Sequence, residues 1–278
     1  MIILRYINKS IFFLGLSCLL ISFQIKAQET NSYYETIVEN MDMDILEANL
    51  QQHVDFGSKD PGTEALVNSF NWIKSSYETW GFEDISIDTF NYSGNECYNL
   101  IITKTGTRYP NKYVIIDGHY DTRNGPGAND NGTGTATVLE IARMLKDIDT
   151  EYSVRFIHFS AEEVGLVGSN HYVDHVVVPE AHDIQLVFNI DAVGGVNGMT
   201  NDIIVCERDE SSPNSNNAAS AAITDTLSNL MKLYSNLNTE ISYAYATDYV
   251  PFMEEGYVIT GLYEYNETPY AHTPNDII

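Results

Sequence analysis

Residues 153–169 read SVRFIHFSAEEVGLVGS. The stretch begins with a short run of mostly apolar residues, and two adjacent glutamates, Glu162 and Glu163, follow that run. The apolar run has the length of a strand and is rich in aromatic and β-branched residues, which predicts a buried β-strand. Carboxylates are rarely buried unless they are paired or bind a cation. A strand that ends in two of them therefore indicates a functional site at the edge of a sheet.

Strand-like runs and helical patterns alternate along the rest of the chain. Thr63 can cap the first helical pattern and Gly81 can end it. The stretch GTRYP, residues 106–110, is typical of a hairpin link between the strands on either side of it. The alternation predicts an α/β fold with a largely parallel central sheet. The other predicted strands are residues 84–90, 99–104, 112–117 and 185–191, and the predicted helices are residues 60–82, 133–147 and 218–234.

Two more of the predicted strands end in polar side chains. His119 follows the strand at 112–117, and Asp191 ends the strand at 185–191. In open α/β sheets, ligands bind beyond the carboxyl ends of the strands. Three separate strands therefore deliver metal-competent side chains to one edge of the sheet, which predicts a site there.

Further ligand candidates lie in loops. The stretch GHYDTRNGPGANDNGTGTA, residues 118–136, contributes Asp130, and YAHTPND, residues 270–276, contributes His272. The glycine-rich stretch lacks the GK[ST] ending of a phosphate-binding loop, so we discount that alternative. Asp121 stands two residues after His119, where a carboxylate can orient a metal-binding imidazole.

The set of candidates suits zinc or a related divalent ion, and cobalt and manganese also accept such ligands. It comprises two imidazoles and three carboxylates, because only one of the adjacent glutamates is counted. Five ligands exceed one tetrahedral site and fit two ions that share a bridging carboxylate. The remaining glutamate is then available as a general base.

The order and wording of five motifs resemble the di-zinc exopeptidases, a family that includes secreted bacterial leucyl aminopeptidases, glutamate carboxypeptidases and glutaminyl cyclases. The resemblance runs from about residue 55 to the end, and it implies a three-layer α/β/α sandwich with a mixed, largely parallel sheet of about eight strands. The motifs are GHYDT, PGANDNGTGTA, FSAEEVGLVGS, FNIDAVGG and AHTPND.

The resemblance also implies a role for each candidate. It makes Asp130 the bridge between two zinc ions and Glu162 the general base, while Asp121 orients His119. The remaining ligands divide between the two ions, with His119 and Asp191 at one and Glu163 and His272 at the other.

Two departures from the family pattern stand out. The family often has a histidine after the aspartate that corresponds to Asp248, and here that position is Tyr249. The chain stops at Ile278, six residues after His272, where the family usually continues through a terminal helix. We therefore expect residues 28–278 to form a zinc exopeptidase catalytic domain that lacks this helix.

Composition limits the compartment and the partners. Residues 1–27 have basic residues, an apolar stretch and a small residue, Ala27, in the layout of a signal peptide. We expect a secreted or periplasmic protein, without stable membrane association after cleavage, that is a monomer. The formal net charge of −25 argues against nucleic acid as a partner. The sequence leaves open whether Cys97 and Cys206 pair.

These patterns favour a metal-dependent aminopeptidase that acts on peptides. One alternative is a glutaminyl cyclase-like enzyme with a single zinc, which metal stoichiometry would distinguish. Another is a truncated, inactive binding domain. The pair His171 and His175 has the spacing of ligands on one helix face but lacks the adjacent glutamate of an HExxH motif, so we assign it a structural or surface role.

Overall fold

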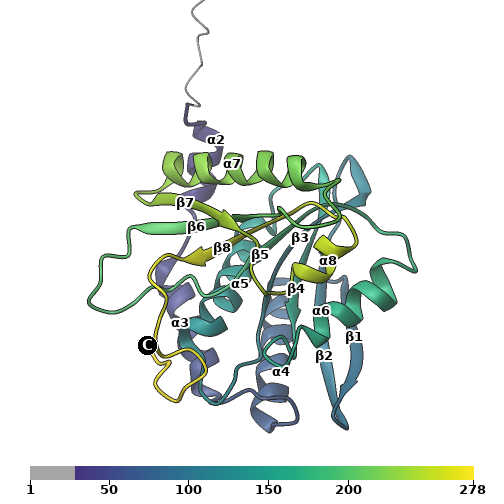
Figure 1. Ribbon diagram of the computed structural model, residues 1–278, viewed down its shortest axis with the longest axis vertical. Helices are drawn as coiled ribbons and strands as arrows, with labels where there is room; N and C mark the ends of the chain where they lie inside the picture. The colour runs from purple at the N-terminus through teal and green to yellow at the C-terminus, as the bar shows by residue number, and fades with distance from the viewer. Residues whose placement is uncertain (1–28) are drawn as a thin grey trace, which may run out of the picture.

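The computed structural model describes residues 29–278, so the predicted signal peptide lies outside the described residues. A central sheet has helices packed on its faces (Figure 1). The strands are β1 (Ile85–Tyr92), β2 (Asn95–Lys104), β3 (Tyr109–His119), β4 (Tyr152–Phe159), β5 (Asp183–Ile190), β6 (Ile203–Arg208), β7 (Asn238–Tyr243) and β8 (Ile259–Glu264). The helices are α2 (Ser32–Val38), α3 (Met43–Asp55), α4 (Glu64–Trp80), η2 (Ala128–Thr133), α5 (Gly134–Leu145), α6 (Val167–Tyr172), η3 (Val173–Val177), α7 (Asn217–Tyr234) and α8 (Val250–Glu254).

The sheet has eight strands in the order β1-β2-β4-β3-β5-β8-β6-β7. The pairs β3–β4, β3–β5, β5–β8 and β6–β7 are parallel, and the other three pairs are antiparallel. The predicted mixed α/β fold is thus confirmed. The hairpin predicted at residues 106–110 is wrong, because β4 lies between β2 and β3 and pairs with both.

Each face of the sheet carries its own core. On one face, α4 and α5 pack against residues that include Leu100, Ile116 and Phe156. On the other face, α6, η3 and α8 cover Ile115 and Ile157. The alternation of strand side chains between these two cores produces three layers, helix on sheet on helix.

Helix α4 begins and ends where the sequence predicts. The Thr63 hydroxyl accepts a hydrogen bond from the Leu66 amide at 3.2 Å, and this N-cap satisfies one free donor of the first turn. Gly81 ends the helix in the left-handed conformation with φ of 85°.

The buried stripe of α7 is polar. Ser220, Thr224 and Ser228 stand four residues apart and are buried. The Ser220 hydroxyl donates to the Ile259 carbonyl at 2.6 Å, and the Thr224 hydroxyl donates to the Glu207 carbonyl at 3.0 Å. Short hydroxyl side chains therefore let this helix lie close to β6 and β8.

Residues 29–278 contain no helix that is both long and apolar enough to span a bilayer. The last strand, β8, is followed by turns from 265 to 278. Both remaining cysteines, Cys97 and Cys206, are buried and free.

Candidate metal centre

The carboxyl ends of β4, β3 and β5 bring the site together. These three strands are parallel neighbours in the centre of the sheet, with His119 opposite Phe159 in the β3–β4 register. The glutamates stand in the turn just after β4, and Asp191 directly follows β5. Neighbouring parallel strands end at one edge of a sheet, so the three strand ends converge as the sequence predicts.

Asp130 lies at the centre of the cluster. It belongs to η2, in a stretch whose backbone is not helical at Asp130 itself. Its Oδ1 lies 3.4 Å from Nε2 of His119, and its Oδ2 lies 3.1 Å from Nε2 of His272. One carboxylate therefore faces both histidines, one with each oxygen.

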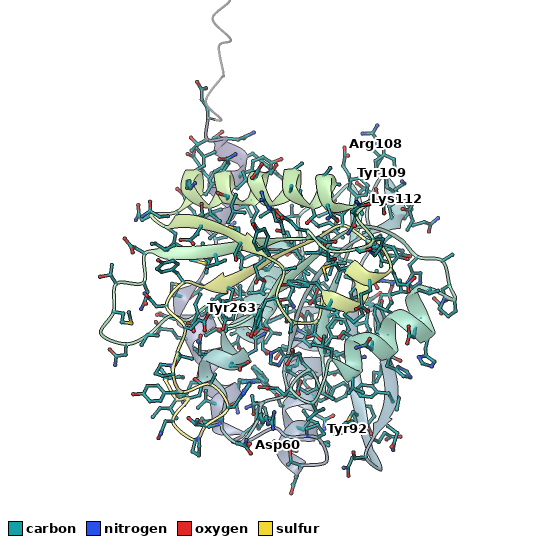
Figure 2. All side chains as sticks on the ribbon, in the orientation of Figure 1. Asp60, Tyr92, Arg108, Tyr109, Lys112 and Tyr263 are labelled. Carbon is teal, nitrogen blue, oxygen red and sulfur yellow. The ribbon has the colours of Figure 1, made fainter. Side chains whose placement is uncertain are left out.

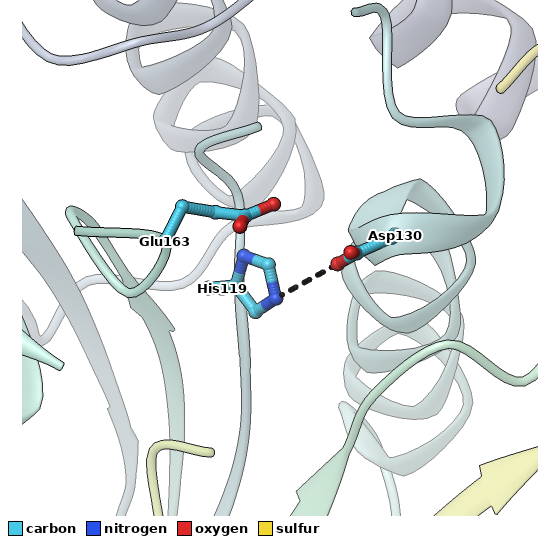
Figure 3. A group of neighbouring side chains, drawn as sticks. All are labelled: His119, Asp130 and Glu163. Carbon is cyan, nitrogen blue, oxygen red and sulfur yellow. Dashed lines mark ion pairs between the residues drawn. The ribbon is translucent and has the colours of Figure 1, made fainter. Parts of the chain in front are cut away.

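A further carboxylate accompanies each histidine. Asp191 Oδ1 lies 3.4 Å from His119 Nε2, and Glu163 Oε2 lies 2.7 Å from His272 Nε2. Figure 3 shows His119, Asp130 and Glu163 directed toward one another, and a ligand atom from each lies within 4.8 Å of the others. The five predicted ligands thus form one cluster with two halves that share Asp130.

Glu162 also lies beside this cluster and lines the cavity over it. Its Oε2 lies 3.9 Å from His119 Nε2. The carboxylate of Asp121 accepts the amide of Glu162 at 3.1 Å and that of Glu163 at 3.3 Å. His119 Nδ1 lies 3.1 Å from the backbone oxygen of Asp121 and 3.7 Å from its carboxylate. Asp121 thus meets His119 mainly through its carbonyl, while its carboxylate holds the backbone of both glutamates.

Crowding and burial strongly shift the pKa values of the carboxylates in this cluster. Burial, followed by the charge of Asp130, raises the pKa of Glu163 to about 8, and burial raises the pKa of Glu162 well above its usual value. Burial acts on Asp130 too, but hydrogen bonds from His119 and His272 outweigh it and hold the pKa of Asp130 well below its usual range. Several carboxylates this close together repel one another, so their arrangement favours the binding of cations or protons between them.

The donor set fits zinc. Imidazole nitrogens and carboxylate oxygens are zinc ligands, and both kinds converge here. One oxygen of Glu163, Oε1, is buried and has no hydrogen-bond partner in the described structure, so it is free to bind a metal ion. Among residues 29–278, His119, Asp130 and Glu163 form a group whose atoms lie close enough together to hold a metal ion.

Two residues of the site were not identified from the sequence. The Thr247 hydroxyl donates to Asp191 Oδ2 at 2.7 Å, which leaves Oδ1 of Asp191 directed at His119. The Asp276 carboxylate accepts the amides of Asn129 and Asp130 at 2.9 and 3.1 Å. Asp276 stands within the AHTPND motif, so its position in the motif was the available signal.

The pair His171 and His175 lies elsewhere. Their rings stack with centroids 4.2 Å apart, and His171 Nδ1 lies 3.0 Å from Asp88. The two histidines thus form a local stack on α6 and η3 and are not joined to the cluster around Asp130.

A cavity of about 380 Å³ opens over the cluster. Tyr245, Tyr263 and Leu166 supply apolar surface to its wall, and Glu264 adds a further carboxylate. His272 is the only basic side chain in the lining. The cavity therefore combines an acidic floor with a partly aromatic wall.

Tyr249, at the position of the family histidine, is not among the residues that line this cavity. It is buried, and its hydroxyl donates to Glu207 Oε2 at 2.9 Å and accepts the Tyr245 amide at 2.5 Å. Its hydroxyl therefore holds the segment that carries Tyr245 and does not reach the candidate ligands.

Comparison with known sequences assigns the family. A profile described as peptidase family M28 matches residues 99–278, which include the whole cluster. The chain belongs to peptidase family M28. Aminopeptidase YwaD of Bacillus subtilis is 38% identical over 175 residues, which are 59% of this chain and 36% of that relative. The chain spans no more than 36% of the length of the curated relatives it matches first.

Solved structures agree with the M28 fold. The crystal structure of LapA from Legionella pneumophila has a TM-score of 0.76 at 22% identity and covers 91% of this chain and 71% of that chain. A zinc aminopeptidase from Bacillus subtilis has a TM-score of 0.53 at 30% identity and covers 66% of this chain and 45% of that chain. The first likeness supports the fold, and the second adds a relative that is named for zinc.

Proposed function

We propose that this M28 chain is a metal-dependent aminopeptidase that hydrolyses N-terminal residues from peptides with two zinc ions. The observation that carries the proposal is the arrangement around Asp130, which faces His119 with one oxygen and His272 with the other. Asp191 and Glu163 complete the two halves. Such a divided set, with one shared carboxylate, is the arrangement that a pair of ions needs.

The five candidate ligands divide between the two proposed ions. His119, Asp191 and Asp130 would hold one ion, and His272, Glu163 and Asp130 the other. Zinc bound at such a site polarises a carbonyl group and makes a water a stronger acid. Cobalt or manganese can serve in the same ligands.

Glu162 is the general base in this proposal. It lies beside the centre, 3.9 Å from His119 Nε2, and lines the cavity. Burial raises the pKa of Glu162, which gives the carboxylate a stronger affinity for the proton that it must take from the attacking water. Glu162 then passes that proton to the amine that leaves.

The charge of the cavity favours the amino end of a peptide. Asp130, Glu162, Glu163, Asp191 and Glu264 line it, and no lysine or arginine does. A free α-ammonium group is attracted to such a lining, whereas a C-terminal carboxylate is repelled. This argues for an aminopeptidase over a carboxypeptidase.

The test is an assay on aminoacyl 4-nitroanilides with the whole chain. We expect release of nitroaniline that stops after chelation, returns on adding zinc, and does not occur with N-acetylated substrates. Activity that survives complete removal of metal would show that the proposed mechanism is wrong.

The same preparation separates the alternatives. A glutaminyl cyclase-like enzyme would retain one zinc per chain and cyclise N-terminal glutamine, whereas we expect two zinc ions and peptide hydrolysis. An inactive binding domain would bind zinc, if at all, without releasing amino acids. Metal analysis and product analysis together decide among the three.

We also propose that the chain is exported and acts as a monomer on peptides. Support for export comes from the signal-like sequence of residues 1–27. N-terminal sequencing of the protein recovered from the producing cell is expected to begin at residue 28, and size-exclusion chromatography with light scattering tests the monomer.

A further inference from the structure

A buried lysine contacts the loop between His119 and Asp130. Lys59, in the link between α3 and α4, is 0% exposed, and it is the only lysine or arginine of residues 29–278 that is buried. Lysine is almost never fully buried unless its charge is compensated. A buried ammonium group at this place therefore needs an explanation.

The ammonium group of Lys59 donates to three backbone carbonyls. The acceptors are His53 at 3.1 Å, Gly57 at 2.8 Å and Pro126 at 2.7 Å. The first lies in the last turn of α3, where carbonyls lack partners within the helix. The third lies in the loop between His119 and Asp130. Lys59 thus joins the end of α3 to the loop that carries the central ligand.

The backbone of Lys59 reinforces this connection. Its amide donates to the Thr122 hydroxyl at 2.9 Å, and that hydroxyl donates to the Gly125 carbonyl at 2.7 Å. Residues 122 and 125 both belong to the loop. The lysine therefore contacts the loop through its main chain at one end and through its ammonium group at the other.

The loop itself has little regular structure to fix its path. Gly127 adopts the left-handed conformation with φ of 60°, and a Cβ there would lie 2.2 Å from Thr122 Cγ2. Asp130 and Asn131 have non-helical backbone angles. Contacts from outside the loop must therefore set where Asp130 stands.

Two such contacts hold the loop at or shortly before Asp130. Lys59 binds the carbonyl of Pro126, four residues before Asp130, and the Asp276 carboxylate binds the amide of Asp130. Burial lowers the pKa of Lys59 to about 7, and the charges of Asp121, Asp276 and Asp60 act in the opposite direction. Lys59 thus donates three hydrogen bonds, one of which holds the loop at Pro126.

We propose that Lys59 is a positioning residue of the metal centre, whose ammonium group fixes the loop that places Asp130 between His119 and His272. The proposal rests on the metal centre of the proposed function. It requires no contact between Lys59 and metal or substrate. It predicts that loss of the ammonium group weakens zinc binding, beyond any loss of stability.

The test compares Lys59→Met with Lys112→Met in the whole chain. Lys112 is half-exposed, pairs with Asp183 at 3.2 Å, and lies at the end of the sheet remote from Asp60 (Figure 2). Zinc affinity is measured by competition with a chromogenic chelator, at a temperature where the metal-free variants are folded by circular dichroism. This readout does not depend on peptidase activity.

We expect Lys59→Met to weaken zinc binding by about tenfold or more, in the range known for groups that orient metal ligands. Lys112→Met is expected to bind zinc as the unmodified chain does. Lys59→Arg keeps the charge and the donors and should recover most of the affinity. Where Lys59→Met yields too little folded protein, Lys59→Gln, which keeps two donors without the charge, is expected to bind zinc at least threefold more weakly.

Zinc affinities within twofold of the unmodified chain in Lys59→Met or Lys59→Gln would overturn the proposal, even if the melting temperature of the metal-free protein falls. Equal weakening in Lys59→Arg and Lys59→Met would also overturn it. An unmodified chain that binds no zinc would instead contradict the proposed metal centre. An unmodified chain that binds zinc but hydrolyses no peptide would leave the Lys59 comparison intact and contradict the aminopeptidase assignment.

Discussion

At the scale of single residues, two adjacent glutamates meet different partners. Glu163 contacts His272 at 2.7 Å, whereas Glu162 approaches His119 only to 3.9 Å. Both follow the end of β4, in a turn where successive side chains are no longer forced to opposite faces of a sheet. Their amides are held by the two oxygens of Asp121, which fixes both at once.

This division gives the first prediction. Glu162→Gln should keep the bound zinc and lose activity by a factor of about 10² to 10⁴, the contribution of a general base. Glu163→Gln should lose zinc, because it removes a charged ligand. Metal content after dialysis and kcat of the zinc-loaded protein measure the two effects. Equal zinc loss in both variants would contradict the assignment.

Thr247 gives a second prediction at this scale. Thr247→Val has nearly the same volume but removes the hydroxyl that donates to Asp191. We expect zinc binding to weaken by about tenfold, as for other groups that orient a ligand. Thr226→Val is the matched control, since Thr226 is exposed on α7 and bonds only to its own helix. Zinc titration of both variants is the measurement, and an unchanged affinity in Thr247→Val would rule out this role.

At the scale of elements, the segment between β7 and α8 is held by a tyrosine where the family often has histidine. The Tyr249 hydroxyl joins Glu207 on β6 to the amide of Tyr245 in the cavity wall. Gly261 on β8 leaves room for this contact, because a Cβ there would lie 2.9 Å from both Glu207 Oε2 and Tyr249 Cε1. Two strands and the segment before α8 therefore cooperate to place one wall residue.

The third prediction concerns this contact. Tyr249→Phe leaves a buried carboxylate and an amide without their partner, which should lower the free energy of unfolding by about 1–3 kcal/mol. If Tyr245 contacts the substrate, KM should rise more than kcat falls. Tyr243→Phe, at an exposed position on β7, is the control for loss of a hydroxyl. Urea unfolding and steady-state kinetics check the two parts, and a variant as stable as the control would contradict the first.

At the scale of the whole molecule, two buried neutral histidines link stability to pH. Burial lowers the pKa of His158 to about 3 and holds the pKa of His53 well below its ordinary value. In the unfolded chain both titrate near 6.5. As the pH falls below about 6.5, the unfolded state therefore binds more protons than the folded state. The free energy of unfolding decreases accordingly.

The fourth prediction is the slope of this loss. Each histidine should reduce the free energy of unfolding by about 1.4 kcal/mol per pH unit between about pH 6 and pH 4. His158→Gln should flatten the slope by that amount, although it also disturbs the contact with Tyr77. His175→Gln, at an exposed position, should leave the slope unchanged. Urea unfolding across this pH range is the measurement, and equal slopes in both variants would refute the assignment.

The sequence by itself determined the first five strands, the helices α4, α5 and α7, and the candidate ligands, whereas β6, β7 and β8 were not predicted. The spacing of apolar residues and the capping residues are local signals, so the sequence predicted the strand before Glu162 and the helix cap at Thr63. The rule that parallel strands end at one edge brought His119, Asp191 and the glutamates together before any contact was known. The loop stretches 118–136 and 270–276 added Asp130 and His272, and the family resemblance then implied a role for each candidate.

Only the tertiary structure decided how distant segments meet. The hairpin predicted at residues 106–110 failed because strand order depends on long-range pairing, and β4 enters between β2 and β3. The polar stripe of α7, the contact of Thr247 with Asp191 and the burial of Lys59 likewise depend on neighbours far along the chain. Hydroxyl and ammonium groups carry no periodic signal, and their partners are set by packing, which is why the sequence named candidate ligands and Asp121 but not the contacts of Thr247 and Lys59.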